Sequence, residues 1–122
     1  NMSRKFDDLD PLFKAKAIEL VARCVEAGIP VVIVDTLRSH KEQAEYLKQG
    51  VSWTKNSRHL VGKAIDLCPI RSYMGPGTTK LNWDDVNPDW GKIGAIGARL
   101  GLIWGGNWTQ RDLGHFELLE LP

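Results

Sequence analysis

The most constraining feature of this sequence is a carboxylate that falls in the middle of an expected strand. Residues 62–70 are predicted to be extended, and the alternation of side chains along a strand places Ala64, Asp66 and Cys68 on one face. A carboxylate among apolar neighbours is costly to desolvate unless a cation or hydrogen bonds compensate its charge. A fold that keeps Asp66 in a sheet must therefore bring a compensating group to it, and a metal ion is one such group.

Two of the three histidines in the chain are placed to join this carboxylate. His59 precedes Asp66 by seven positions, and His115 lies far downstream. Catalytic zinc takes three protein ligands of the N, O or S type and leaves one position open, and these three side chains provide that set. His40 is an alternative ligand, although its place in the first turn of an expected helix favours a solvated position.

The remaining elements define the fold class. In order, the chain is expected to form a helix from Pro11 to Gly28, a strand over 30–36, a helix from Ser39 to Gly50, a strand over 62–70, a helix from Asn87 to Gly101, a strand over 102–104 and an alternating stretch over 112–119. This order predicts an α+β fold, with a small, mainly antiparallel sheet carrying helices on one side. The length favours a single domain over residues 1–122.

Two segments raise structural questions of their own. The third expected helix carries Gly91, Gly94 and Gly97 at three-residue steps, and glycine weakens a helix by about 1 kcal/mol relative to alanine. We expect close packing of the backbone to compensate this loss. Residues 71–89 form the longest irregular segment and are typical of a flap over a site. Trp83 and Trp90 either line a groove there or close the edge of the core.

The composition argues against two classes of protein. The 16 basic and 15 acidic residues give a net charge of +1, which provides no broad field for holding nucleic acid. No apolar run approaches the roughly 20 residues that span a bilayer, and the N-terminus lacks the apolar core of a signal peptide. We expect a soluble monomer made in the cytoplasm. Cys24 and Cys68 lack the spacing of a zinc knuckle or redox pair, so two buried free thiols are expected, with a disulfide as the alternative.

The residues around the candidate ligands match a known pattern. Residues 57–66 read Ser-x-His-x-x-Gly-x-Ala-x-Asp, residues 112–115 read Asp-x-x-His, and residues 38–43 read Arg-Ser-x-x-Glu-Gln. Together these motifs resemble the zinc D-Ala-D-Ala carboxypeptidase and L-alanoyl-D-glutamate endopeptidase family, with its VanX/VanY-like and phage endolysin-type branches. The chain has Asp112 where VanX-like members have Glu, which is similar to the endolysin-type branch. It has Gly114 where relatives often have proline.

The resemblance implies a role for each motif residue. The implied roles are zinc ligands at His59, Asp66 and His115, a general base at Asp112, an oxyanion-stabilising cation at Arg38 and a substrate contact at Ser57. The general base takes a proton from water and passes it to the leaving amine. The arginine offsets the charge that develops on the tetrahedral oxygen.

The implied function is a zinc peptidase that hydrolyses peptidoglycan stem peptides, with the L-Ala–D-Glu bond as the expected target. One alternative is a D,D-carboxypeptidase or dipeptidase that acts on D-Ala-D-Ala termini. Another is a non-catalytic zinc-containing module that binds wall peptide or a protein. The presence of both Asp112 and Arg38 favours catalysis, because a binding module needs no base beside its metal. An enzyme of this kind acts on the cell wall, in the periplasm or outside the cell, after release from the cytoplasm.

Overall fold

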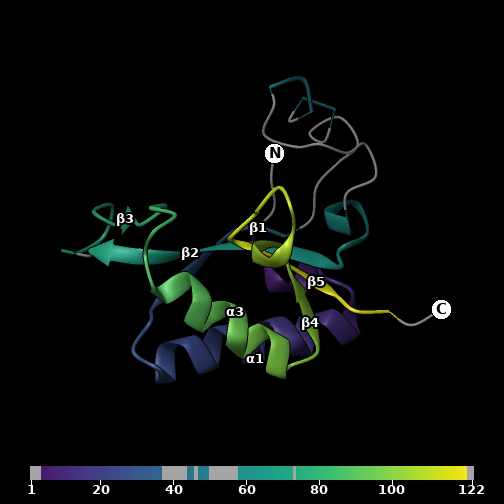
Figure 1. The fold of residues 1–122 in the computed structure, drawn as a ribbon, viewed down its shortest axis with the longest axis horizontal. Coiled ribbons are helices and arrows are strands. Elements are labelled where there is room, and N and C mark those ends of the chain that lie inside the picture. The colour runs from purple at the N-terminus through teal and green to yellow at the C-terminus, as the bar shows by residue number, and fades with distance from the viewer. Residues whose placement is uncertain (1–3, 37–43, 46, 50–57, 73, 121–122) are drawn as a thin grey trace.

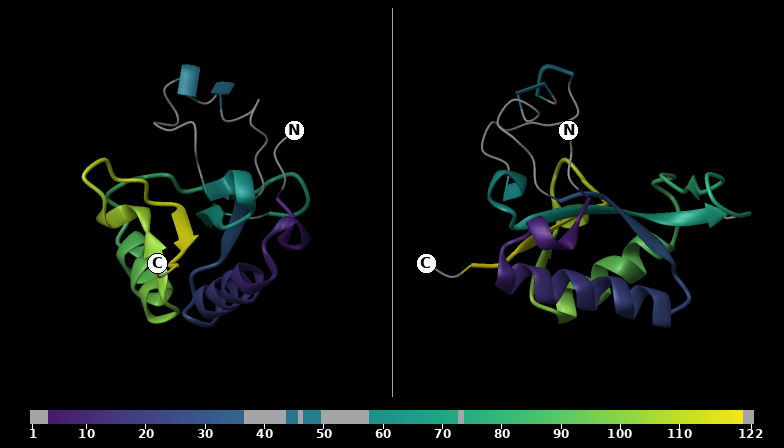
Figure 2. Two further views of the ribbon diagram at one scale, coloured as in Figure 1. Left: turned by 90° about the vertical axis from the view of Figure 1, so that its right-hand side faces the viewer. Right: turned by 180° about the vertical axis from the view of Figure 1, so that it is seen from behind.

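A computed structural model describes residues 4–36, 44–45, 47–49, 58–72 and 74–120. Its elements are η1 (Phe6–Asp8), α1 (Pro11–Glu26), β1 (Val31–Asp35), η2 (Arg58–Val61), β2 (Ala64–Ser72), β3 (Lys80–Leu81), α3 (Asp89–Arg99), β4 (Leu102–Trp104), η3 (Gly105–Asn107) and β5 (His115–Leu118), where η denotes a short 3₁₀ helix. The strand order is β1-β2-β5-β4, with β3 paired to β2, and every pairing is antiparallel. Helices α1 and α3 lie on one side of this sheet (Figures 1 and 2). The predicted α+β class is confirmed.

Helix α1 begins and ends where the sequence predicts. The Asp10 carboxylate accepts a hydrogen bond from the Phe13 backbone N–H at 3.2 Å, and Pro11 occupies the first turn, where its missing N–H costs nothing. Gly28 follows the helix with a φ of 79°, a conformation that favours glycine. The predicted helix from Ser39 falls largely outside the described residues, although residues 44–45 and 47–48 are helical.

The glycines of α3 let the helix approach the sheet closely. A Cβ atom on Gly94 would overlap the ring of Trp104, and one on Gly97 would lie 2.5 Å from the ring of Phe116. The predicted compensation by close packing is confirmed at these two positions. It is wrong for Gly91, which is exposed and has open space around its Cα.

The pairing register divides the side chains of the sheet between two faces. Phe116 pairs with Ile65 and packs on Gly97 of α3, so this pair faces the helices. The next pair, Asp66 with His115, therefore faces the opposite side. Asp35 of β1 pairs with Asp66 from the other edge of β2. Three neighbouring strands thus contribute a polar side chain to the face that α1 and α3 leave uncovered.

Residues 71–89 contain more regular structure than the sequence indicates. Strand β2 continues to Ser72, and β3 pairs with it through Leu81 and Ile70. Trp90 is 2% exposed and donates a hydrogen bond from its indole N–H to the Asp84 carbonyl at 2.9 Å, so it closes the edge of the core. Trp83 stacks on Trp90 with ring centroids 6.1 Å apart and remains half exposed.

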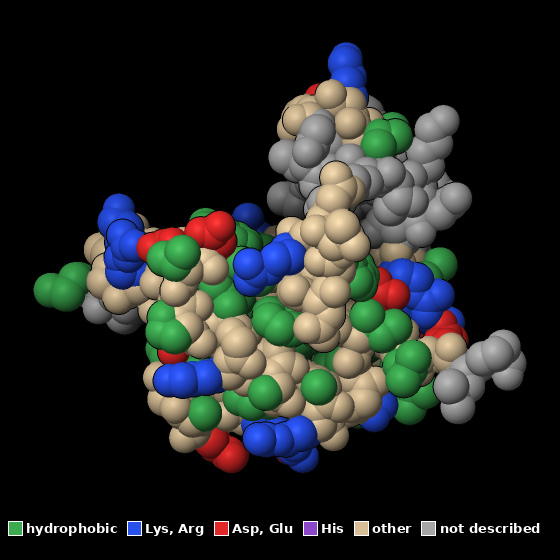
Figure 3. Space-filling view, in the orientation of Figure 1, with side chains coloured by type: hydrophobic (Ala, Val, Ile, Leu, Met, Phe, Trp, Pro, Cys, Tyr) green, Lys and Arg blue, Asp and Glu red, His purple; other side chains and the backbone are tan. Residues whose placement is uncertain are grey.

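Both thiols are buried and free, as predicted. Burial raises the pKa of Cys24 and of Cys68 to about 11. No helix in the described part of the chain is long and apolar enough to cross a membrane. Side chains of both charges are interspersed over the face seen in Figure 3.

Candidate metal centre

Three side chains that are distant in the sequence meet on the uncovered face of the sheet. His59 comes from η2, Asp66 from the middle of β2 and His115 from the start of β5. The Asp66 Oδ1 atom lies 3.3 Å from His59 Nε2 and 3.2 Å from His115 Nδ1. One potential ligand atom from each residue lies within 4.8 Å of the others. This spacing allows all three atoms to coordinate one metal ion.

A tight turn before β2 places His59. Gly62 has a φ of 69°, and a Cβ atom there would lie 3.0 Å from the Asp8 carbonyl oxygen. The Gly62 carbonyl in turn accepts a hydrogen bond from the Asp10 N–H at 2.9 Å. Glycine is therefore required both for the turn and for the close approach of the segment before α1.

Hydrogen bonds on the outer side of each imidazole orient its inner nitrogen. His59 donates from Nδ1 to the Thr36 carbonyl at 3.0 Å, which leaves Nε2 toward Asp66. His115 donates from Nε2 to the Glu117 carboxylate at 2.8 Å, which leaves Nδ1 toward Asp66. Metal-binding histidines commonly donate their other N–H to a carbonyl or a carboxylate in this way.

The charges of the cluster compensate each other without a metal ion. Burial favours the neutral imidazole of His115, but hydrogen bonds to Asp66 and Glu117, with the charges of Asp66 and Asp112, outweigh it and raise the pKa of His115 to about 9. Burial likewise opposes the charge of Asp66, yet hydrogen bonds from His115 and His59 hold its pKa well below the usual range. The mid-strand carboxylate is therefore ionised and is compensated by imidazole groups, which a divalent cation could replace in that role.

Asp112 lies at the open side of the cluster. Its Oδ2 atom is 3.9 Å from His115 Nδ1, and its side chain is 37% exposed. The Gly105 carbonyl accepts the Asp112 N–H at 3.0 Å, and the Asp112 carbonyl accepts the His115 N–H at 3.2 Å. A Cβ atom on Gly105 would lie 2.5 Å from the Asp112 carbonyl oxygen, so this turn holds the carboxylate close to η3.

Some residues around the cluster were given no role from the sequence. Glu117 follows His115 by two residues in the alternating stretch over 112–119, and this spacing was the available signal. Trp108 is 38% exposed, and its ring centroid lies 5.0 Å from that of His115. Asp35 is buried, with Oδ2 4.0 Å from His59 Nδ1, and a polar residue at the end of an apolar strand was its only signal. The Thr36 contact is made by a backbone carbonyl, which no residue type can reveal.

The structure leaves part of the predicted site unplaced. Arg38, Ser57 and the alternative ligand His40 lie outside the described residues. The other predicted site residues, which are His59, Asp66, Asp112 and His115, are brought together as described above.

Comparison with known proteins identifies the family of this chain. A family model described as D-alanyl-D-alanine carboxypeptidase matches residues 50–118. The chain is also 34% identical over 125 residues to the peptidoglycan L-alanyl-D-glutamate endopeptidase CwlK of Bacillus subtilis, in an alignment that covers 92% of this chain and 74% of CwlK. The chain belongs to the D-alanyl-D-alanine carboxypeptidase and L-alanyl-D-glutamate endopeptidase family. The predicted family resemblance is thus confirmed.

Further similar proteins extend the comparison. The L-alanyl-D-glutamate peptidase of Listeria phage A118 is 37% identical over 97 residues, which cover 79% of this chain and 32% of the phage protein. Among solved structures, the L-Ala D-Glu endopeptidase ChiX of Serratia marcescens has a TM-score of 0.70 and 28% identity, covering 98% of this chain and 89% of ChiX. The D,D-pentapeptidase VanY, solved with Zn(II), shares the fold, with a TM-score of 0.64, 14% identity, and coverage of 90% of this chain and 72% of VanY.

Proposed function

We propose that this member of the peptidase family is a zinc enzyme that hydrolyses the L-Ala–D-Glu bond of peptidoglycan stem peptides. The observation that carries the proposal is the cluster of His59, Asp66 and His115 with Asp112 beside it. The choice of bond is supported by the activity for which CwlK, the phage A118 peptidase and ChiX are named. Such a substrate lies in the cell wall, so the enzyme acts there, and each metal-binding group comes from one chain, which suits a monomer.

The donor set suits zinc. His59 would bind through Nε2, His115 through Nδ1 and Asp66 through Oδ1, because the outer nitrogen of each imidazole already donates a hydrogen bond. Two imidazoles and one carboxylate form a ligand set found in catalytic zinc sites, which keep one position open. When bound, zinc polarises the scissile carbonyl and lowers the pKa of water.

Side chains of the protein carry out proton transfer, shielding from water, oxyanion stabilisation and substrate contact. Asp112 accepts a proton from the attacking water and delivers it to the leaving amine as the carbon–nitrogen bond breaks, a role that its partial exposure permits. Trp108 covers the ring of His115 and limits the access of water to that ligand. Arg38 stabilises the developing oxyanion and Ser57 contacts the substrate. Both of these last roles rest on the motifs of the sequence.

Digestion of purified sacculi with zinc-loaded protein tests the proposal. Mass spectrometry of the products is expected to show new D-Glu amino termini, and Asp112→Asn is expected to lose this activity while it keeps its zinc. Arg111→Gln, which changes the neighbouring exposed residue, is the matched control and should cleave normally. Release of free D-Ala would instead indicate a D,D-carboxypeptidase, and intact sacculi with bound zinc would indicate a binding module.

A further inference from the structure

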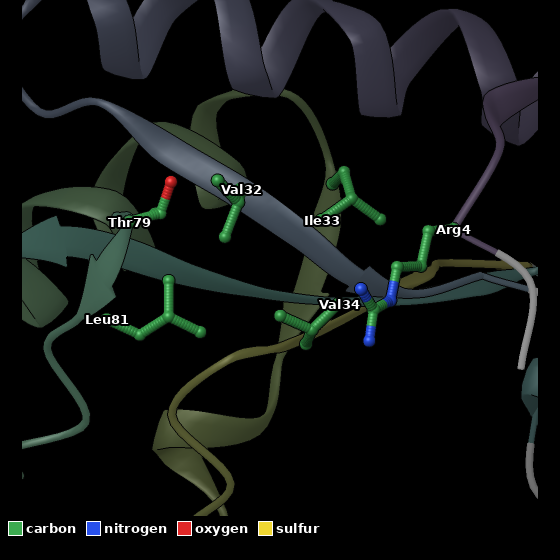
Figure 4. Close-up of a pocket in the computed structure, with 6 residues that line it drawn as sticks. All are labelled: Arg4, Val32, Ile33, Val34, Thr79 and Leu81. Carbon is green, nitrogen blue, oxygen red and sulfur yellow. The ribbon is translucent and has the colours of Figure 1, made fainter. Parts of the chain in front are cut away.

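A hollow lies along β1, the strand that ends at Asp35. It has a volume of about 300 Å³ and is lined by Arg4, Val32, Ile33, Val34, Thr79 and Leu81 (Figure 4). Val32 and Val34 of β1 point away from α1, and Leu81 of β3 extends toward them. Val32 and Val34 therefore give the hollow an apolar wall on the side of the sheet that α1 and α3 leave uncovered, which is also the side of Asp66 and His115. Ile33 lines the hollow from the side toward α1.

Along β2, the hollow is offset from the metal centre by two residues. Val32 pairs with Cys68, which follows Asp66 by two residues on β2. Two residues of a strand span about 7 Å, so a peptide held at Asp66 reaches the hollow with its next residue. Val34 is followed directly by Asp35, the partner of Asp66, so the hollow and the cluster share the same stretch of β1.

Arg4 gives the hollow a positive charge. Its guanidinium lies beside Val34, away from the end of the hollow that Thr79 lines (Figure 4). Arg4 is exposed, and its guanidinium has no hydrogen-bond or ion-pair partner among the described residues. A guanidinium presents a fork of N–H groups that matches a carboxylate in two parallel hydrogen bonds. The hollow thus combines a short apolar surface with a cation at the end nearest the cluster.

We propose that this hollow is the subsite for the D-glutamyl residue, and that Arg4 binds the free carboxylate of that residue. The inference rests on the proposed cleavage of the L-Ala–D-Glu bond. A glutamyl residue within a peptide uses one of its two carboxyl groups in an amide bond and keeps the other as an anion. Methylene groups lie between these two carboxyl groups. Val32, Val34 and Leu81 contact the methylene groups, and the anion pairs with Arg4.

Two stem peptides that differ only at the D-glutamyl residue provide the test. One carries the free carboxylate and the other carries a carboxamide in its place. The wild-type protein is expected to hydrolyse the acid with a kcat/KM about threefold to fivefold higher, mainly through KM, as for an exposed ion pair. Arg4→Gln is expected to hydrolyse the two peptides with equal kcat/KM.

A matched control and a binding measurement complete the test. Arg111→Gln removes the same charge outside the hollow and is expected to keep the preference for the acid. Calorimetric titration with a product peptide that begins with D-Glu should show a Kd about threefold to fivefold weaker for Arg4→Gln than for the wild type. This second readout does not depend on hydrolysis.

The outcomes separate this inference from the proposed function. Equal hydrolysis of both peptides by the wild type, or loss of the preference in Arg111→Gln as well, overturns the subsite while cleavage at L-Ala–D-Glu still stands. An unchanged product Kd in Arg4→Gln also overturns the subsite. A wild-type protein that cleaves neither peptide at this bond overturns both.

Discussion

At the scale of single residues, the hydrogen bond between His115 and Glu117 offers a direct test of the metal centre. Glu117→Gln keeps the size of the side chain but removes the charge that orients and polarises the imidazole. The affinity for zinc is expected to fall about tenfold to a hundredfold, as is usual when such an outer partner is changed. Competition with a chromogenic chelator measures it.

Glu120→Gln is the control for this change. Glu120 lies two residues after the end of β5 and pairs at the surface with Arg58 and Lys63, outside the cluster. Its replacement should leave zinc affinity unchanged. Equal affinities for the wild type and both variants would contradict the role given to Glu117.

The buried thiols predict how stability responds to alkaline pH. The pKa of each thiol is raised to about 11 in the folded protein, from an ordinary value of 9.0. An unfolded chain therefore loses these protons first, so the free energy of unfolding should fall as the pH rises from about 9 to about 11. Urea denaturation at pH 8 and at pH 10.5 measures this fall.

A variant without the thiols identifies their share of the effect. The double change Cys24→Ala and Cys68→Ala costs stability at every pH because it opens space in the core. The free energy of unfolding of this variant should nevertheless fall less between pH 8 and pH 10.5 than that of the wild type. A decline of the same size would show that other groups cause it.

How far the cluster could be predicted depends on what each residue contacts. Asp66 and His115 could be placed on strands because alternation of side chains is a local pattern. The role of Glu117 required the rotamer of His115, and the role of Thr36 required its backbone carbonyl to lie beside η2. Both contacts depend on the tertiary structure, which the sequence pattern does not contain.

At the scale of the elements, α3 shows why a periodic pattern could mislead. The three glycines have the same spacing and each follows a large apolar residue, so that pattern did not separate Gly91 from the two that pack on the sheet. Only the position of α3 against β4 and β5 distinguishes them. In contrast, helix starts and stops depend on local capping, which explains why the ends of α1 were predictable.

A pair of substitutions in α3 tests this distinction. Gly94→Ala is expected to destabilise the protein by about 1 to 3 kcal/mol because its methyl group would overlap Trp104. Gly91→Ala is expected to stabilise it by up to about 1 kcal/mol, because alanine is the better helix former and the site is open. Urea denaturation gives both values, and a similar effect of the two changes would contradict the packing described for α3.

At the scale of the whole molecule, the proposed ion would connect η2, β2 and β5. Removing it with a chelator should therefore lower the melting temperature, and zinc should restore it. Binding stabilises the folded state by about 2.7 kcal/mol when the free ion is at a hundred times its Kd. Thermal melts with chelator and with added zinc measure the difference.

Two variants separate the proposed ligands from the proposed base. Asp66→Asn should abolish the dependence of melting temperature on zinc. Asp112→Asn should keep it, although activity is lost. If zinc stabilised Asp66→Asn as much as the wild type, the assignment of Asp66 as a ligand would be wrong.

The sheet separates the two tasks of the molecule. The faces of α1 and α3 that stabilise the fold pack on one side, and the cluster lies on the other, together with Val32 and Val34 of the hollow. In the proposed subsite, selection for a new peptide substrate can therefore change Val32, which lies outside the core cluster. Val34 and Leu81 also pack against the core, so changes at these two positions affect specificity and stability together.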